Sequence, residues 1–147
     1  MLYIAADHGG YQLKKYLIKY IKTQLKRDVE DLGAFEPNPT DDFPDFAIAL
    51  GKKVVKNKDN RGIMICRTGV GPCMVVNKIK GGRAFTGSSI EIAENGRKHH
   101  NANVVCLGAD IVSNDHAAAI VKKFLETEFD GAERLVRRLK KIEALEK

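Results

Sequence analysis

The sequence has little cysteine, no long apolar run and no basic amino-terminal region, and each scarcity excludes a class of protein. Its three cysteines are an odd number and none stands in a C-x-x-C pair, so a disulfide framework is excluded and free thiols in a reducing compartment are expected. Even the longest apolar runs are short, such as Val104–Leu107, and none could span a bilayer. The chain begins MLYIAADHGG and meets Asp7 early, which argues against a signal peptide. We therefore expect a cytoplasmic protein without a membrane partner.

Size and composition indicate one ordinary globular domain. The chain has 147 residues, of which 44% are hydrophobic and 30% charged. This length suits one hydrophobic core, so we expect a single domain over residues 1–147.

The formal charge of +6 raises the possibility of a nucleic-acid partner. Basic residues occur in two clusters, one near the start of the chain and one near its end. They are Lys14, Lys15, Lys19, Lys22, Lys26 and Arg27, and then Arg134, Arg137, Arg138, Lys140 and Lys141. The first follows a helical period and is typical of a solvated helix face, whereas the second could equally bind an anion. No aromatic-rich face or nucleic-acid motif accompanies either, so no nucleic-acid partner is expected.

Apolar runs and turn residues predict strands that alternate with helices. Expected strands cover residues 2–6, 29–32, 62–66, 83–86 and 103–107. Expected helices cover residues 10–26, 44–55, 70–80, 89–99, 113–127 and 131–145. Such β-α repetition predicts an α/β fold with a five-stranded parallel sheet and helices on both faces.

Three polar clusters adjoin the strands of this expected sheet. They are Asp7–Gly10 after the first strand, Cys66–Gly71 after the third, and His99–Asn101 before the fifth. Ligands of open parallel sheets bind beyond the carboxyl ends of the strands. We expect the three clusters to converge there.

The Cys66 segment has the composition of an anion-binding loop. Gly69 and Gly71 flank Val70, which lets backbone N–H groups point inward beside a helix N-terminus. The same environment would stabilise a thiolate at Cys66, available as a base or nucleophile. A buried cysteine beside an ordinary turn is the alternative interpretation. The dinucleotide motif lacks its third glycine at Met74, and the phosphatase motif lacks its arginine at Pro72. A P-loop needs Gly-Lys-Ser/Thr, which is not present.

The remaining polar residues are less specific. His99 and His100 are adjacent and diverge on one helix, so one could face the cleft or both could lie at a solvated helix end. Asp7 and His8 could bind a ligand or only cap a turn. No set of ligands has metal-binding spacing, so neither a metal nor another cofactor is expected.

In order along nearly the whole chain, these segments resemble the ribose-5-phosphate isomerase B / galactose-6-phosphate isomerase family. The segments that carry the resemblance are Asp7–Tyr11, Asp42–Ala47, Gly62–Gly71, Asn77–Lys78, Asn103–Gly108 and Phe129–Gly131. The resemblance implies a three-layer Rossmann-like fold and a cofactor-free aldose–ketose isomerase that acts on a sugar phosphate through an enediolate. It also implies a homodimer or homotetramer with active sites at a subunit interface. The carboxy-terminal helix, which carries an apolar stripe, is expected to pack on the partner or else on its own domain.

The resemblance also implies roles for individual residues. Cys66 is the expected base, Thr68 and the backbone from Arg67 through Gly69 and Val70 to Gly71 hold the oxyanion, and His99 opens the sugar ring. Asp7 and His8 bind substrate, with His100 beside the ring-opening histidine, and Arg137 reaches the phosphate from the neighbouring subunit.

Five positions depart from the family pattern. Arg67 replaces a glycine, His100-Asn101 replaces Asn-Asp, and Asp110 and Glu133 stand where phosphate-binding arginines are usual. Either Arg67 and Arg134 supply the missing charge, or the substrate is a different, six-carbon or unphosphorylated sugar, or the chain is a non-catalytic sugar-phosphate-binding subunit. Because the two acids would repel a phosphate dianion, the sequence alone predicts weak activity on ribose 5-phosphate and better activity on another sugar or sugar phosphate.

Overall fold

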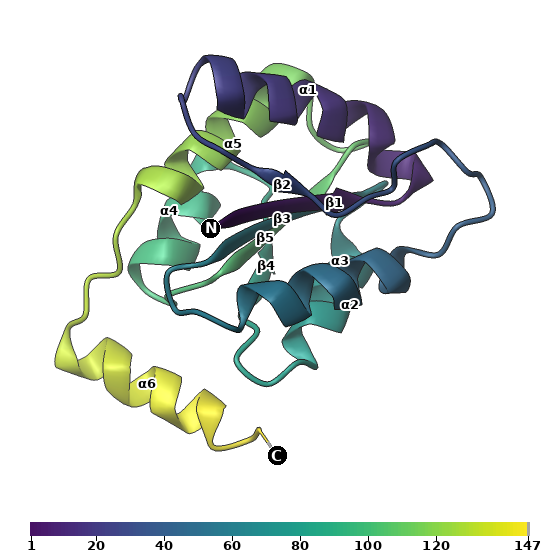
Figure 1. Cartoon of the computed structure of the whole chain (residues 1–147). Coiled ribbons are helices and arrows are strands. Elements are labelled where there is room, and N and C mark those ends of the chain that lie inside the picture. Colours follow the sequence, from purple (N-terminus) through teal and green to yellow (C-terminus); the bar gives the residue numbers. More distant parts are fainter. Residues whose placement is uncertain (147) are drawn as a thin grey trace.

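The computed structural model describes residues 1–146 and contains one parallel sheet between two layers of helices (Figure 1). The strand order is β2-β1-β3-β5-β4, and every neighbouring pair is parallel. The strands are β1 (Leu2–Ala6), β2 (Glu30–Asp31), β3 (Arg61–Cys66), β4 (Ala84–Thr86) and β5 (Val104–Gly108). The predicted α/β fold is confirmed.

Helices cover both faces of the sheet. One layer contains α1 (Tyr11–Thr23), α4 (Ile90–Lys98) and α5 (Asn114–Glu126), and the other contains α2 (Phe43–Val54) and α3 (Val70–Asn77). A 3₁₀ turn, η1 (His8–Gly10), joins β1 to α1. The last helix, α6 (Glu133–Glu143), lies apart from both layers, near the amino ends of the strands (Figure 1).

The central strands are apolar throughout because each buries both of its faces. In β1, Leu2, Ile4 and Ala6 pack in the α1/α4/α5 layer, whereas Tyr3 and Ala5 pack in the α2/α3 layer. Successive side chains of a strand point to opposite faces, so a doubly covered strand carries no polar alternation.

Capping residues begin several helices at their predicted positions. The Ser89 hydroxyl accepts a hydrogen bond from the Ile92 N–H, and the Ser113 hydroxyl accepts one from the His116 N–H. Pro44 lies in the first turn of α2, where its missing N–H costs nothing.

Some boundaries differ from the prediction, and turns explain the differences. The first helix ends at Thr23, and Lys26 has a positive φ of 52°. The third helix ends at Asn77, because Ile79 and Gly82 continue as tight turns. The last begins at Glu133, after Gly131 with a φ of 74°.

Lys14 was predicted on the solvated face of its helix, and this prediction is wrong. Its side chain is 1% exposed, and its ammonium contacts the two carboxylate oxygens of Asp31 at 2.8 and 3.0 Å. It also donates to the Ala34 carbonyl. A buried ammonium needs such partners, and these contacts link α1 to β2 and to the segment after it.

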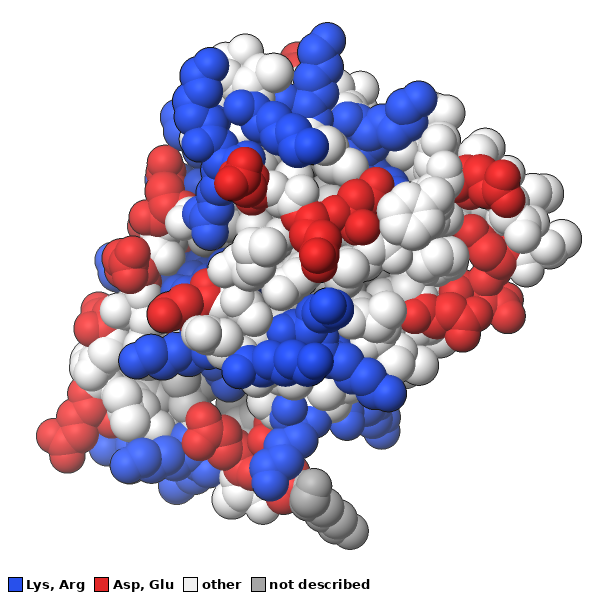
Figure 2. Space-filling model, viewed as in Figure 1, with Lys and Arg blue, Asp and Glu red and all other residues white. Residues whose placement is uncertain are grey.

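Charges are mixed on the face shown in Figure 2. Basic side chains gather over α1 and again around α2 and α6, with acidic side chains between them. Among residues 1–146, no helix combines the length and apolar character that a membrane crossing requires.

Candidate active site

Cys66 ends the central strand β3 and lies at the carboxyl edge of the sheet. Its side chain is buried, and its Sγ accepts a hydrogen bond from the Gly69 N–H at 3.0 Å. Helix α3 begins one residue later, at Val70. The thiol therefore sits against a backbone donor and a helix N-terminus, which both favour negative charge.

The loop after Cys66 requires glycine at position 69. Gly69 has a φ of 82°, and a Cβ there would lie 3.1 Å from both the Cys106 oxygen and the Leu107 carbonyl carbon. Only glycine adopts this conformation cheaply. The turn aims the Gly69 N–H at the thiol, and the Thr68 hydroxyl accepts from the Val70 N–H at 3.4 Å.

Asp7 lies at the end of the neighbouring strand β1. It is 7% exposed, and its carboxylate accepts the Gly10 N–H at 3.2 Å. Burial raises the pKa of Asp7, against the lowering effects of that hydrogen bond and of His8. The sequence left open whether Asp7 binds a ligand or only caps a turn. In the structure Asp7 caps η1 at the candidate site, so one position is compatible with both interpretations.

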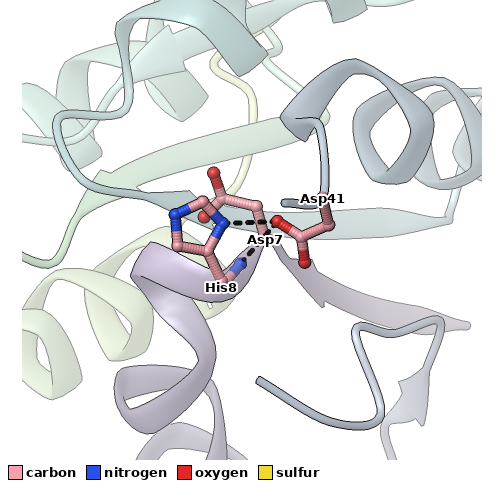
Figure 3. A group of neighbouring side chains, drawn as sticks. All are labelled: Asp7, His8 and Asp41. Carbon is pink, nitrogen blue, oxygen red and sulfur yellow. Dashed lines mark hydrogen bonds and ion pairs between the residues drawn. The ribbon is translucent and has the colours of Figure 1, made fainter. Parts of the chain in front are cut away.

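His8 pairs with a residue that the sequence did not single out. Its Nδ1 lies 2.5 Å from Oδ1 of Asp41, and its backbone N–H donates to the same oxygen at 3.1 Å (Figure 3). Asp41 belongs to the segment before α2, 33 residues further along the chain. No local pattern marks this pair, because only the fold brings the two segments together.

Arg67 lies over the Asp7–Gly10 turn. Its Cγ would be 2.6 Å from a Cβ at Gly9, and its Nη1 lies 3.8 Å from Oδ2 of Asp110. Both side chains are more than half exposed. Arg67 therefore stands between β1 and β5 at the sheet edge and offsets the charge of Asp110.

Three possible metal-ligating side chains lie close together: Asp7, His8 and, far from both in the sequence, Asp41. One possible ligand atom from each lies within 4.8 Å of the others, a grouping that spacing along the sequence does not indicate. His8 Nδ1 and Asp41 Oδ1 nevertheless lie 2.5 Å apart, the distance of a direct hydrogen bond between the two side chains. Around an octahedral ion with bonds of about 2.0–2.1 Å, adjacent ligand atoms lie about 2.9 Å apart. The 2.5 Å between the His8 and Asp41 atoms is shorter than that, so their spacing suits a hydrogen bond better than two ligands of one ion.

His99 and His100 do not join this group, and the expected convergence of the three clusters is wrong. Helix α4 runs against the strand direction, so its end reaches the amino edge of the sheet. Asn103, just beyond, bonds through its backbone to Arg83 and Gly62, which lie at the starts of β4 and β3. His99 caps the end of α4, and its Nδ1 pairs with the Asn95 side chain at 2.9 Å.

Arg134 and Arg137 also lie away from Cys66 in this chain. Both are on α6, and Arg137 lines a shallow pocket formed by α6 residues alone. The predicted site residues thus fall into two groups. The group at the carboxyl edge of the sheet comprises Cys66, Thr68, the glycine loop, Arg67, Asp7 and His8. The group away from this edge comprises His99, His100, Arg134 and Arg137.

The fold and the strand-end thiol are compatible with several activities, and comparisons with known proteins identify the family. The sequence profile described as ribose/galactose isomerase matches residues 2–142. A probable ribose-5-phosphate isomerase B of Mycoplasma pneumoniae is 42% identical over 146 residues, which cover 99% of this chain and 95% of that protein. The chain belongs to the ribose/galactose isomerase family and is an aldose–ketose isomerase, as predicted.

Solved structures extend the likeness to three dimensions. The crystal structure of ribose-5-phosphate isomerase B from Mycoplasma genitalium with bound ribulose-5-phosphate has a TM-score of 0.92 and 43% identity, covering 97% of this chain and 93% of that one. Ribose-5-phosphate isomerase B from Clostridium thermocellum has a TM-score of 0.92 and 35% identity, covering 98% and 95%. The Rossmann-like fold is therefore confirmed.

Proposed function

We propose that the chain interconverts ribose 5-phosphate and ribulose 5-phosphate, with Cys66 as the base. The observation that carries this proposal is the buried thiol at the end of β3, with the Gly69 N–H 3.0 Å from its sulfur. The ribulose-5-phosphate-bound relative supports the choice of a five-carbon sugar phosphate.

The proposed step moves one carbon-bound proton. In the open-chain aldose, the Cys66 thiolate removes the proton from C2, and the electron pair of that bond forms the C1–C2 double bond of an enediolate. The thiol then returns the proton to C1, while the hydroxyl proton of O2 is transferred to O1. Atoms and electrons balance without an oxidant, because oxidation of C2 accompanies reduction of C1.

Stabilisation of the enediolate oxygen would come from the loop after Cys66. Thr68 and the N–H groups between Arg67 and Gly71 lie at the start of α3. Preorganised donors at a developing oxyanion typically contribute several kcal/mol. Asp7 and His8 would hold the sugar from the neighbouring strand end.

Ring opening and phosphate binding are proposed to need a second subunit. Within one chain, four of the expected site residues lie away from Cys66, namely His99, His100, Arg134 and Arg137. We propose that a partner copy brings these groups to the site. A homodimer or homotetramer with composite sites follows from this proposal.

The phosphate pocket is proposed to be rearranged around Arg67. Asp110 faces Arg67 at 3.8 Å, which offsets the repulsion that an isolated carboxylate would exert on a phosphate dianion. A six-carbon or unphosphorylated substrate remains the alternative, since Glu133 and Asp110 are still acids. Relative kcat/KM values for ribose 5-phosphate, hexose phosphates and free sugars distinguish the two, and preference for a hexose or a free sugar would contradict the proposal.

Cys66→Ala tests the base directly. We expect a loss of turnover of about 10²–10⁴-fold, the usual contribution of general base catalysis, with the fold retained. Cys73→Ala is the matched control, because Cys73 lies on α3 outside the proposed site. Near-normal turnover of Cys66→Ala would refute the assignment.

Metal-free catalysis is a separate expectation with its own test. Exhaustive chelation followed by assay should leave turnover unchanged, and activity lost to chelation and restored by a divalent ion would contradict it.

We also propose that residues 1–147 form one domain and act in the cytoplasm, to be checked by a single cooperative unfolding transition and by cell fractionation.

A further inference from the structure

We infer that Asp41 is a positioning residue for His8 and holds its ring so that Nε2 faces the substrate. This inference rests on the proposed function, because it assumes that His8 binds the sugar phosphate. It adds a residue from the segment before α2 to a site built otherwise from strand ends and the α3 loop.

The contact between Asp41 and His8 is double. Oδ1 of Asp41 lies 3.1 Å from the backbone nitrogen of His8 and 2.5 Å from its Nδ1. One oxygen therefore fixes both the backbone and the ring of the same residue. The η1 turn alone would leave the ring to rotate about two side-chain bonds.

Burial makes this contact hard to replace by water. The Asp41 side chain is 10% exposed and that of His8 is 26% exposed. Oδ2 of Asp41 is buried and has no hydrogen-bond partner within residues 1–146. A carboxylate in such surroundings depends on its remaining partner, so the pair with His8 is the main interaction of this side chain.

The contact also selects the tautomer of His8. A carboxylate only accepts hydrogen bonds, so Nδ1 must carry the proton. The other ring nitrogen points away from Asp41 (Figure 3) and remains for the substrate. Carboxylates that orient a functional imidazole in this way are a common arrangement.

A purely structural role is the competing interpretation, because Asp41 also ties the segment before α2 to the end of β1. Asn38 provides the matched control. It orders the same segment, its Oδ1 accepting from the Thr40 N–H at 3.0 Å and from the Thr40 hydroxyl at 2.8 Å. Loss of these bonds loosens the segment without touching His8.

The test is steady-state kinetics of Asp41→Ala, Asp41→Asn, His8→Ala, the double variant Asp41→Ala/His8→Ala, and Asn38→Ala with ribose 5-phosphate. We expect Asp41→Ala to raise KM about tenfold, the effect of one lost hydrogen bond to a bound group, with kcat within about twofold. Asp41→Asn should recover most of the KM, since its amide oxygen still accepts from Nδ1–H. In the His8→Ala background, Asp41→Ala should have no further effect.

Several results would overturn the inference. Independent effects of the two alanine substitutions would show that Asp41 acts apart from His8, and a raised KM in Asn38→Ala would assign the effect to the segment. If Asp41→Ala does not fold, nitrogen NMR of the His8 ring in the unmodified protein decides, and protonation at Nε2 alone would refute it. Absence of wild-type turnover refutes the proposed function, whereas turnover with independent effects refutes this inference only.

Discussion

Two thiols behind the candidate site differ in their protonation because they share one hydrogen bond. The bond from Cys106 lowers the pKa of Cys73 to about 7, assisted by Thr86 and Asn77 and opposed by burial. The same bond, together with burial, raises the pKa of Cys106. Cys73 is half-buried and Cys106 fully buried, so only Cys73 should react with a mild alkylating agent.

We therefore expect iodoacetamide to label Cys73 with a rate that rises through pH 7 and levels off above it. Measurement by mass spectrometry in the Cys66→Ala background removes the contribution of the candidate base. Cys106→Ala should move the midpoint of labelling upward toward the ordinary value of 9.0, because it deletes the largest lowering effect. A midpoint that stays near 7 in Cys106→Ala would contradict this account.

Asp7, which is proposed to bind the sugar, shows how burial of a carboxylate affects stability. Because burial raises its pKa, the folded protein favours the neutral acid. Its contribution to stability is then fully present below the ordinary pKa of 3.8 and is lost as the pH rises through the raised value. Above the raised pKa, the buried, ionised carboxylate of Asp7 thus lowers the free energy of unfolding.

Asp7→Asn should remove this cost. We expect its free energy of unfolding to exceed that of the wild type at pH 7, with the difference shrinking as the pH falls toward 3.8, while substrate binding weakens. Urea unfolding between pH 4 and 7 measures the trend. Asp59→Asn, at an exposed loop carboxylate, should show no such dependence, and a parallel trend there would indicate a general charge effect.

At the scale of single elements, the turn between β3 and α3 connects packing to chemistry. Gly69→Ala would add strain at a φ of 82° and place a methyl group 3.1 Å from the β5 backbone. We expect about 1–3 kcal/mol of destabilisation together with a lower kcat, because the N–H that faces Cys66 would move.

Gly81→Ala is the matched control for this prediction. Gly81 has a similar φ of 87°, but its nearest contacts are ordinary ones to Val55 at 3.5 Å, and it lies outside the candidate site. It should lose stability and keep kcat. Equal loss of kcat in both variants would show that global stability, rather than the turn, governs activity.

Elements were predictable from sequence where their signal is local. The apolar run of β3, the serine caps at positions 89 and 113, and Pro44 in the first turn of α2 depend on neighbours a few residues away. The Cys66 loop was found for the same reason, since thiol, glycines and helix start are contiguous.

Residues whose environment comes from distant segments were not predictable. Lys14 follows the period of a solvated face, yet Asp31 and Ala34 bury it. Asp41 has no local signature, because its partner His8 lies 33 residues away. The placement of His99 failed for a different reason: a helix that returns against the strand direction carries its last residue to the opposite edge of the sheet.

At the scale of the whole molecule, α6 carries the apolar surface that the proposed second subunit would cover. Leu135 and Leu139 are buried within the chain, whereas Ile142 is 49% and Leu145 81% exposed. Leu139, Ile142 and Leu145 line one side of a pocket of about 700 Å³ whose other side includes Phe85. Half of the predicted apolar stripe therefore packs on its own domain and half remains available to a partner.

Mixing two inactive variants tests whether the proposed site is composite. Cys66→Ala keeps His99, and His99→Ala keeps Cys66, so a mixed dimer contains one site with both groups intact if each site takes them from different subunits. After mixing and reassembly, about a quarter of the wild-type activity should return for a two-fold symmetric dimer with random exchange. If Cys66 and His99 act within one chain, mixing restores nothing, because every site lacks one of them. A monomeric mass by light scattering at micromolar concentration would contradict the composite site before any mixing is done.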